Sequence, residues 1–418
     1  MILRKFMQWA ATASSSERAE GAGSLARAYL HADLSPQDRR EAELALTSLL
    51  DDPAACVRKA IAERFASAAE APPAIVVALA NDQSDVAAPV LGRSPLLGDG
   101  ELIDCAAIGD AFAQAAIALR KELSPAVAAA IAEVAAREAL IALAVNPGAD
   151  IPEFSLRRMV ERFGADGELR EAMLSRAGLP PSVRADLVSA TAAALSKFVV
   201  GRDWLSPERA DRAVREACDK AHVLIAADAE RASDWRAARE LVRHLRVCGR
   251  LTPSLALRAL LSGNLCLFEA LLVELSGLPA KKAVPLARDW RGAGFSAIYA
   301  AAGLPAKLLP AFRAALSARH ELTVSTEAGA ARLSRAMIER VLTACEGGDP
   351  RELGSLMALL RRFDAEAARE EAREAAEQLF APEIVSRPVF AALGDGRFVS
   401  SPRVIVIDLE AIEAELAA

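Results

Sequence analysis

The sequence predicts an all-α fold, a HEAT-like α-solenoid of short helical hairpins with a small C-terminal extension. Three observations favour this fold: an alanine-rich composition, prolines at regular intervals, and repeated Gly-Leu-Pro turns. The chain has 418 residues and is 53% hydrophobic but only 5% aromatic, so its apolar content comes from small and aliphatic side chains. Small side chains allow many short helices to pack closely. Disorder and a disulfide scaffold are excluded by this composition.

Prolines mark the expected helix starts, because proline is favoured at the first helical position. From Pro95 onward most of these starts are 26 to 30 residues apart, which fits two helices of about ten residues with their turns. The expected starts are Pro36, Pro73, Pro95, Pro125, Pro152, Pro180, Pro207, Pro253, Pro279 and Pro305.

Three of these prolines belong to a longer repeated phrase. Ala-Gly-Leu-Pro occurs at 177–180 and 302–305, and Ser-Gly-Leu-Pro at 276–279. We expect the glycine to end one helix in the left-handed conformation and the proline to begin the next. The repetition of this turn predicts a stack of helical hairpins.

A second internal match lies in the N-terminal third. LLDDPAACVRKAIA (49–62) aligns with LANDQSDVAAPVLG (79–92), so that Asp52 matches Asp82 and Val57 matches Val86. This pattern resembles a HEAT repeat, in which an aspartate caps the turn and a valine opens the second helix toward the core. The spacing is shorter than the usual 40–47 residues. The alternative fold is an irregular helical bundle with the same proline and glycine turns.

The chain divides by these patterns into four parts. We assign residues 1–23 to an N-terminal amphipathic helix or arm, 24–203 to HEAT-like repeats, 204–322 to a second helical block and 323–418 to a C-terminal helical cap and tail. In the tail, the turn at 394–396 and the strand-like residues 403–407 allow two readings. One is a β-hairpin and the other an extended segment that docks on a partner.

Three phrases of the sequence resemble a known family. They are VVALANDQSDVAAPVLGRSPLL (76–97), the segment 261–305 that begins LSGNLCLFEALLVELSGLP, and VIDLEAIEAELAA (406–418). They are similar to bacterial proteins known only by a domain of unknown function, with HEAT-like repeats in the N-terminal half. The resemblance implies a helical-repeat fold, and it implies no activity, cofactor or catalytic residue.

The composition also bears on location. Mean hydropathy is +0.20, yet charges interrupt every apolar run before the roughly 20 residues that a membrane span needs. The first ten residues form an amphipathic segment that we expect to dock on the protein, with peripheral membrane contact as the alternative. The six cysteines contain no CxxC pair, and all but Cys345 lie among apolar neighbours. We therefore expect buried thiols and a cytoplasmic location.

We find no catalytic, cofactor-binding or metal-binding pattern in the sequence. The four histidines, His31, His222, His244 and His320, form no HxxxH or HxE pair, and a zinc site needs three or four ligands. We expect His222 to lie at the edge of the core. The glycine pairs at 21–23 and 292–294 do not continue into a phosphate-binding motif.

One charged pattern stands out between residues 235 and 250, where arginines recur at spacings of 3, 4, 3 and 4. On a helix they fall on one face, and guanidinium groups suit carboxylate or phosphate recognition. One reading is a docking ridge for an acidic partner. The other is an internal network with acids such as Glu208, Asp211, Glu216 and Asp219. The candidate partner-binding residues are Arg236, Arg239, Arg243, Arg246 and Arg250.

These observations favour a non-enzymatic scaffold that binds an unknown protein. The alternative is a nucleic-acid-binding or DNA-processing protein that uses the same arginines, although the net charge of −6 disfavours it. A central β-sheet, or a deep cavity surrounded by ionisable side chains, would argue against the scaffold.

Overall fold

The structure is a computed structural model that describes residues 2–231, 234–323, 330–345 and 350–379. These residues form helices joined by short turns, and no strand occurs among them. The prediction of an all-α fold is therefore confirmed. The predicted hairpin at 394–407 lies outside the described residues. The chain divides into two compact units, Met1–Glu371 and Ala372–Ala418, and the packing described below is that of the first unit.

The helices of the N-terminal part are short. They are α1 (Ile2–Ala10), α2 (Ser15–His31), α3 (Pro36–Ser48), η1 (Leu49–Asp51), α4 (Ala55–Phe65), α5 (Pro73–Ala80), α6 (Ser84–Arg93), α7 (Asp99–Ile108), α8 (Ala111–Ala118), α9 (Pro125–Val134), α10 (Arg137–Val145), α11 (Glu153–Phe163) and α12 (Gly167–Leu174).

The helices that follow vary more in length. They are α13 (Pro181–Gly201), α14 (Pro207–Arg231), α15 (Trp235–Val247), α16 (Pro253–Leu261), α17 (Leu265–Ser276), α18 (Ala280–Arg288), α19 (Ala293–Ala301), η2 (Ala306–Leu308), α20 (Leu309–Thr323), α21 (Ala330–Cys345) and α22 (Pro350–Leu379).

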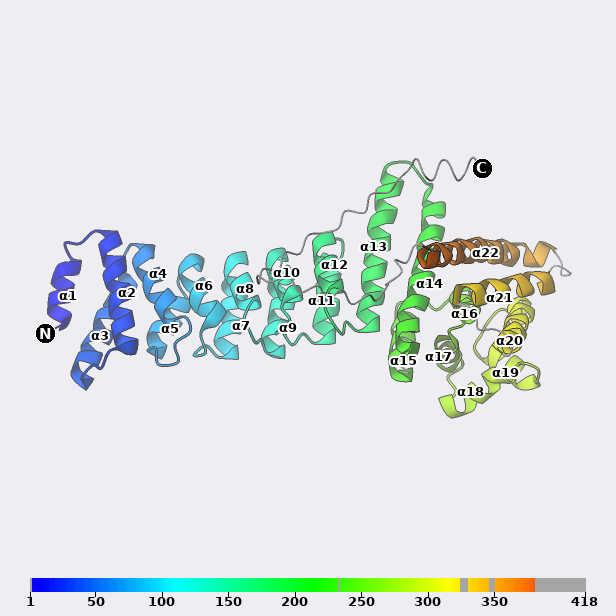
Figure 1. Cartoon of the computed structure of the whole chain (residues 1–418), viewed down its shortest axis with the longest axis horizontal. Coiled ribbons are helices and arrows are strands. Elements are labelled where there is room, and N and C mark those ends of the chain that lie inside the picture. The colour runs from blue at the N-terminus through cyan, green and yellow to red at the C-terminus, as the bar shows by residue number, and fades with distance from the viewer. Residues whose placement is uncertain (1, 232–233, 324–329, 346–349, 380–418) are drawn as a thin grey trace, which may run out of the picture. The chain divides into compact units, whose positions relative to one another are not determined.

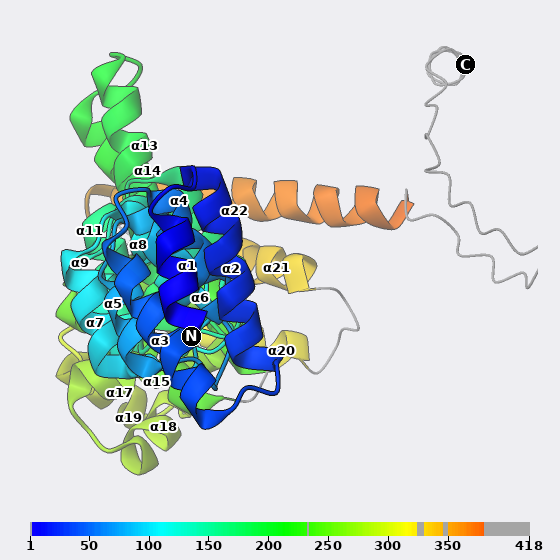
Figure 2. The same ribbon diagram turned by 90° about the vertical axis from the view of Figure 1, so that its left-hand side faces the viewer.

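Helices two apart along the chain pack side by side. The even-numbered helices from α2 to α12 pack in sequence order, and α7, α9, α11 and α13 do the same (Figure 1). Figure 2 looks along this succession, and in it α5, α7 and α9 lie to the left of α2 and α6. These even-numbered helices therefore form one row and these odd-numbered helices a second row. Each helix packs against its neighbours within its own row.

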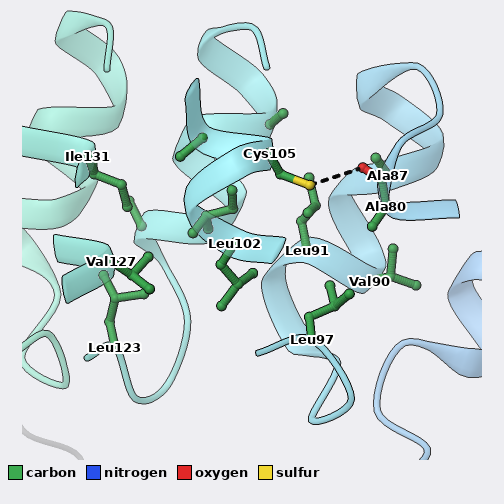
Figure 3. Close-up of a cluster of buried hydrophobic side chains, with 14 of the residues drawn as sticks. Ala80, Ala87, Val90, Leu91, Leu97, Leu102, Cys105, Leu123, Val127 and Ile131 are labelled. Carbon is green, nitrogen blue, oxygen red and sulfur yellow. Dashed lines mark hydrogen bonds between the residues drawn. The ribbon is translucent and has the colours of Figure 1, made fainter. Parts of the chain in front are cut away.

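The buried apolar side chains form two clusters, one running from Ala22 to Leu187 and the other from Ala185 to Ala367. Figure 3 shows part of the first cluster, which includes Leu91 of α6, Leu102 of α7 and Ile131 of α9. The Cys105 thiol in this cluster donates a hydrogen bond to the Ala80 carbonyl over 3.7 Å. The clusters meet in α13, and the predicted boundary at residue 203 stays a prediction.

The left-handed glycines that the sequence predicts in the Gly-Leu-Pro turns are confirmed. Gly178, Gly277 and Gly303 have φ angles of 72°, 68° and 67°, as the Gly-Leu-Pro turns require. Asp52 and Asp82, the two aspartates of the internal match, both form hydrogen bonds in the turn before a helix. Asp52 accepts hydrogen bonds from the Arg18 side chain and the Ala54 N–H.

Proline positions differ from the prediction in detail. Pro36, Pro73, Pro125, Pro207 and Pro253 are the first residues of helices, as expected. At 152, 180, 279 and 305 the proline is instead the N-cap, one residue earlier. Pro95 begins no helix, because α6 ends at Arg93 and α7 begins only at Asp99.

The cysteine prediction was partly wrong. Cys345 is buried, whereas Cys56 and Cys248 are exposed. Cys56 lies in the first turn of α4 and Cys248 is the C-cap of α15, so both occupy helix ends, which apolar neighbours in sequence do not cover. All six cysteines are free thiols.

No described helix has both the length and the apolar composition that crossing a bilayer requires.

Candidate functional site

The arginine-rich segment forms the amphipathic helix that its spacing predicts. Asp234 caps the start of α15 by accepting a hydrogen bond from the Ala237 N–H at 3.0 Å. Leu241 and Leu245 are buried on the inner face. The helix ends at Val247, and Gly249 then turns the chain with a φ of 66°. Arg250 therefore lies beyond the end of the helix and is not part of its arginine face.

The five arginines have different partners. Arg236 pairs with Glu240 of the same helix at 2.9 Å, and Arg246 pairs with Glu274 of α17 at 3.0 Å. Arg250 donates a hydrogen bond to the Ser189 hydroxyl of α13. Within the described part of the chain, the side chains of Arg239 and Arg243 form no ion pair or hydrogen bond.

The acids named as internal partners of these arginines do not bind them in the described residues. Glu216 instead pairs with Arg362 of α22 at 2.9 Å. The buried Asp219 accepts hydrogen bonds from Ser254 and Thr252. On the external face of α15, Arg236, Arg243 and Arg246 are exposed and Arg239 is half-buried.

Arg250 is one of the residues that line a cavity of about 620 Å³. The cavity lies between α13, α14, the start of α16, η2 and α22. We call it the α14 cavity. Its volume is within the range of small-molecule sites, about 300–1,000 Å³. Its apolar wall comes from Ala193, Val214, Leu257, Leu308, Leu356 and Leu359.

Positive charge predominates in the α14 cavity. Five cationic side chains line it against two carboxylates, a surplus of three, and the cations are Arg212, Arg215, Arg250, Lys307 and Arg362. The start of α16 adds the partial positive charge of a helix N-terminus, where Thr252 is the N-cap. The cavity is therefore suited to an anion.

One face of α14 supplies four of the polar residues. Arg212, Arg215, Asp219 and His222 are spaced 3, 4 and 3 residues apart, so they lie on the same side of the helix. The pattern RxxRxxxDxxH is visible in the sequence. It was missed because the arginines at 236–250 form a longer run of one residue type and His222 was assigned to the edge of the core.

Burial changes the protonation of these groups. It raises the pKa of Asp219 to about 6, against the effect of its hydrogen bonds and of Arg258. Burial, with Arg250 nearby, lowers the pKa of His222 to about 4. Burial also raises the pKa of the Cys218 thiol. At neutral pH the imidazole is uncharged and the thiol is protonated.

His222 is the most unusual residue of the cavity. It is 1% exposed, and neither ring nitrogen has a hydrogen-bond partner. Buried polar groups are nearly always hydrogen-bonded, and each exception requires a physical reason.

A three-residue group that could hold a metal lies where α13 and α15 meet. One ligand atom from each of Asp186, His244 and Cys248 lies within 4.8 Å of the others. The Asp186 Oδ1 is 2.7 Å from His244 Nε2, and the same nitrogen is 3.7 Å from Cys248 Sγ. Because Asp186 belongs to another helix, sequence spacing gave no sign of this group.

An apolar groove of about 400 Å³ lies beside α13 and α14. We call it the α13–α14 groove. Its side chains are Leu174, Leu187, Val188, Thr191, Ala192, Leu195, Ser196, Val199, Leu205, Ala210, Ala213, Val214 and Ala217. Leu174 and Leu195 are 57% and 59% exposed. At the turn between the helices, Phe198 and Trp204 pack edge to face, with centroids 5.7 Å apart, and both are exposed.

The described residues are therefore helical, and they place a cavity lined by charged and apolar side chains and an apolar groove around α14. The family model for uncharacterised proteins conserved in bacteria (DUF2336) matches residues 86–351. The chain therefore belongs to that family, as the three sequence phrases indicated. No curated protein matches the chain, and no solved structure does.

Proposed function

We propose that the protein is a non-enzymatic scaffold, a HEAT-like α-solenoid that binds an amphipathic helix of a partner protein in the α13–α14 groove. The observation that carries the proposal is the groove itself, an exposed apolar surface. Contiguous apolar surface of this kind on a folded chain is typical of interaction sites.

The solenoid is supported by contacts that recur from one hairpin to the next. Arg120 donates hydrogen bonds to the carbonyls of Leu91 and Ser94, at the end of α6. Arg162 does the same for Ala132 and Ala135, at the end of α9. In each case an arginine of a later helical pair satisfies carbonyls that a helix end leaves free. Such contacts join neighbouring repeats in a fixed register.

The shape of the groove favours a helix as its occupant. On the α14 side, Ala210, Ala213 and Ala217 share one face at helical spacing. On the α13 side, Leu187 and Leu195 are larger side chains. A face of alanines beside larger leucines allows close approach of another helix, the helix-in-groove mode of recognition.

The α14 cavity bears on whether the protein is an enzyme, because ionisable side chains surround it. Catalysis needs an activated nucleophile or a base within hydrogen-bond reach of its partner. The Cys218 thiol has a raised pKa, which makes it a poor nucleophile at neutral pH, and His222 has no hydrogen-bonded partner. These properties support binding in the cavity, so we retain the non-enzymatic proposal.

A cross-linking experiment tests the scaffold. A photoreactive amino acid replaces Leu195 in the groove, and in the control it replaces Leu44, which is 56% exposed but distant in sequence. We expect the Leu195 form to cross-link one protein in native cells. The purified partner should then bind the wild type and lose at least tenfold affinity for Ala213→Glu, measured by calorimetry. Equal cross-linking from both positions, or unchanged affinity, would refute the groove.

Nucleic-acid binding is the second candidate, favoured by Arg239 and Arg243. These side chains have no partner in the described residues and belong to one face of α15. Fluorescence anisotropy with labelled duplex and single-stranded DNA at low salt tests it, because electrostatic binding is strongest there. Binding that Arg239→Glu and Arg243→Glu abolish would replace the scaffold proposal. We also propose a cytoplasmic location, which the free thiols support.

A further inference from the structure

We propose that the α14 cavity binds a small organic phosphate, an anionic head group attached to an apolar body. This inference goes beyond the scaffold. The linings of the two sites have only Val214 in common, so each site can be changed at residues that do not line the other.

The first argument is charge. The guanidinium of Arg250 hydrogen-bonds the neutral Ser189 hydroxyl and also interacts with the Cys218 thiol, and it forms no ion pair among the described residues. Arg212 and Arg215 form no ion pair there. Arg362 is already paired with Glu216. A surplus of three positive charges favours a phosphate, which carries up to two negative charges, over a carboxylate, which carries one.

The second argument is His222. Its ring nitrogens are buried and unpartnered, and the residue lines the cavity. A neutral imidazole has one donor and one acceptor. A phosphate oxygen or ester oxygen in the cavity would give the donor a partner. The cost of an unpaired buried group is removed when a ligand supplies the missing hydrogen bond.

The third argument is the apolar wall. Leu257 of α16 and Leu356 and Leu359 of α22 line the cavity beside the charged residues. Inorganic phosphate would leave this surface in contact with water. A ligand that has both an anionic head and an alkyl or aryl body would use both parts of the cavity.

Calorimetry with octyl phosphate, below its micelle concentration and at low ionic strength, tests the proposal on the full chain. We expect one saturable site for octyl phosphate, weaker binding of octanoate and inorganic phosphate, and none of octanol. Arg250→Gln and His222→Leu should each weaken octyl phosphate about tenfold or more, the loss of one charge-assisted or buried hydrogen bond. Arg243→Gln on α15 is the matched control and should bind as the wild type does.

A second measurement uses only the wild-type protein, so its result does not depend on whether the variants fold. In wild-type protein labelled with ¹⁵N-histidine, octyl phosphate should shift the ring nitrogens of His222 and leave those of His31 and His320 unchanged. Absence of saturable binding would overturn the proposal. So would equal affinity of the Arg250→Gln, His222→Leu and control variants, or unchanged His222 resonances at saturation.

Discussion

Replacing His222 with leucine is expected to stabilise the free protein and to change its response to acid. At pH 7 the imidazole is neutral, buried and without hydrogen bonds. A buried unpaired polar group costs about 1–3 kcal/mol, and leucine of similar size removes that cost. We expect the free energy of unfolding of His222→Leu to rise by about 1–2 kcal/mol at pH 7.

The acid response follows from the pKa of His222. It is about 4 in the folded chain and 6.5 in the unfolded chain, so the unfolded chain binds more protons between these values. The pKa difference of His222 therefore costs no stability above pH 6.5, and the cost grows as the pH falls toward 4. This difference between the folded and unfolded pKa of His222 corresponds to about 3 kcal/mol in the free energy of unfolding.

Asp219 has the opposite effect. Its pKa rises from 3.8 to about 6 on folding, so the folded chain binds more protons in that range. Its contribution is full below pH 3.8 and is lost as the pH rises through 6, again by about 3 kcal/mol. In the wild type the two effects nearly cancel.

Single variants should separate them. His222→Leu retains only the Asp219 effect, whereas Asp219→Asn retains only the His222 effect and keeps a side chain that can bond Ser254. Between pH 7 and 4, the unfolding free energy of Asp219→Asn should fall by about 5 kcal/mol relative to that of His222→Leu. Urea unfolding followed by circular dichroism at several pH values measures this difference, and all other carboxylates are common to both variants. Parallel pH profiles for the two variants would refute the assignment of these pKa values.

Three further changes test the packing of the helices. Ile131→Ala removes a fully buried side chain and should cost about 2–5 kcal/mol in urea unfolding, whereas Val145→Ala at a 54% exposed position should cost under about 0.5 kcal/mol; similar losses would contradict the core. Arg162→Met removes the donors to the end of α9 and should cost about 1–3 kcal/mol, so an unchanged urea midpoint would count against that cap. Gly277→Ala, at a φ of 68°, should lower stability by about 1 kcal/mol, and a gain in melting temperature would show that the turn adopts another conformation.

Local signals in the sequence predicted the local structure well. The left-handed conformation of Gly277 depends on its neighbours alone, since the glycine has no Cβ and a proline follows two residues later. The amphipathic face of α15 also follows from spacing within one helix. Pro95 shows the limit, because Leu96 and Leu97 pack toward the core and the next helix starts later at Asp99.

The cavity and the groove depend on contacts between segments that are distant in sequence, and spacing does not reveal them. Arg362 lies 146 residues from Glu216, yet they form an ion pair. His222 could be read as an ordinary core residue until its surroundings were known. The spacing of the arginines predicted the amphipathic helix α15, but the departure of Arg250 from its arginine face depends on where the helix ends.

A change of helix length explains why both sites lie around α14. Helices α4 to α12 have 8 to 11 residues, so successive hairpins can cover one another along their length. α13 and α14 have 21 and 25 residues and extend past their neighbours in Figures 1 and 2. At about 100° per residue, the alanines of the groove and the RxxRxxxDxxH residues of the cavity fall on opposite faces of α14. An extended helix with neighbours along only part of its length leaves surface on both faces, and its sequence makes one face apolar and the other polar.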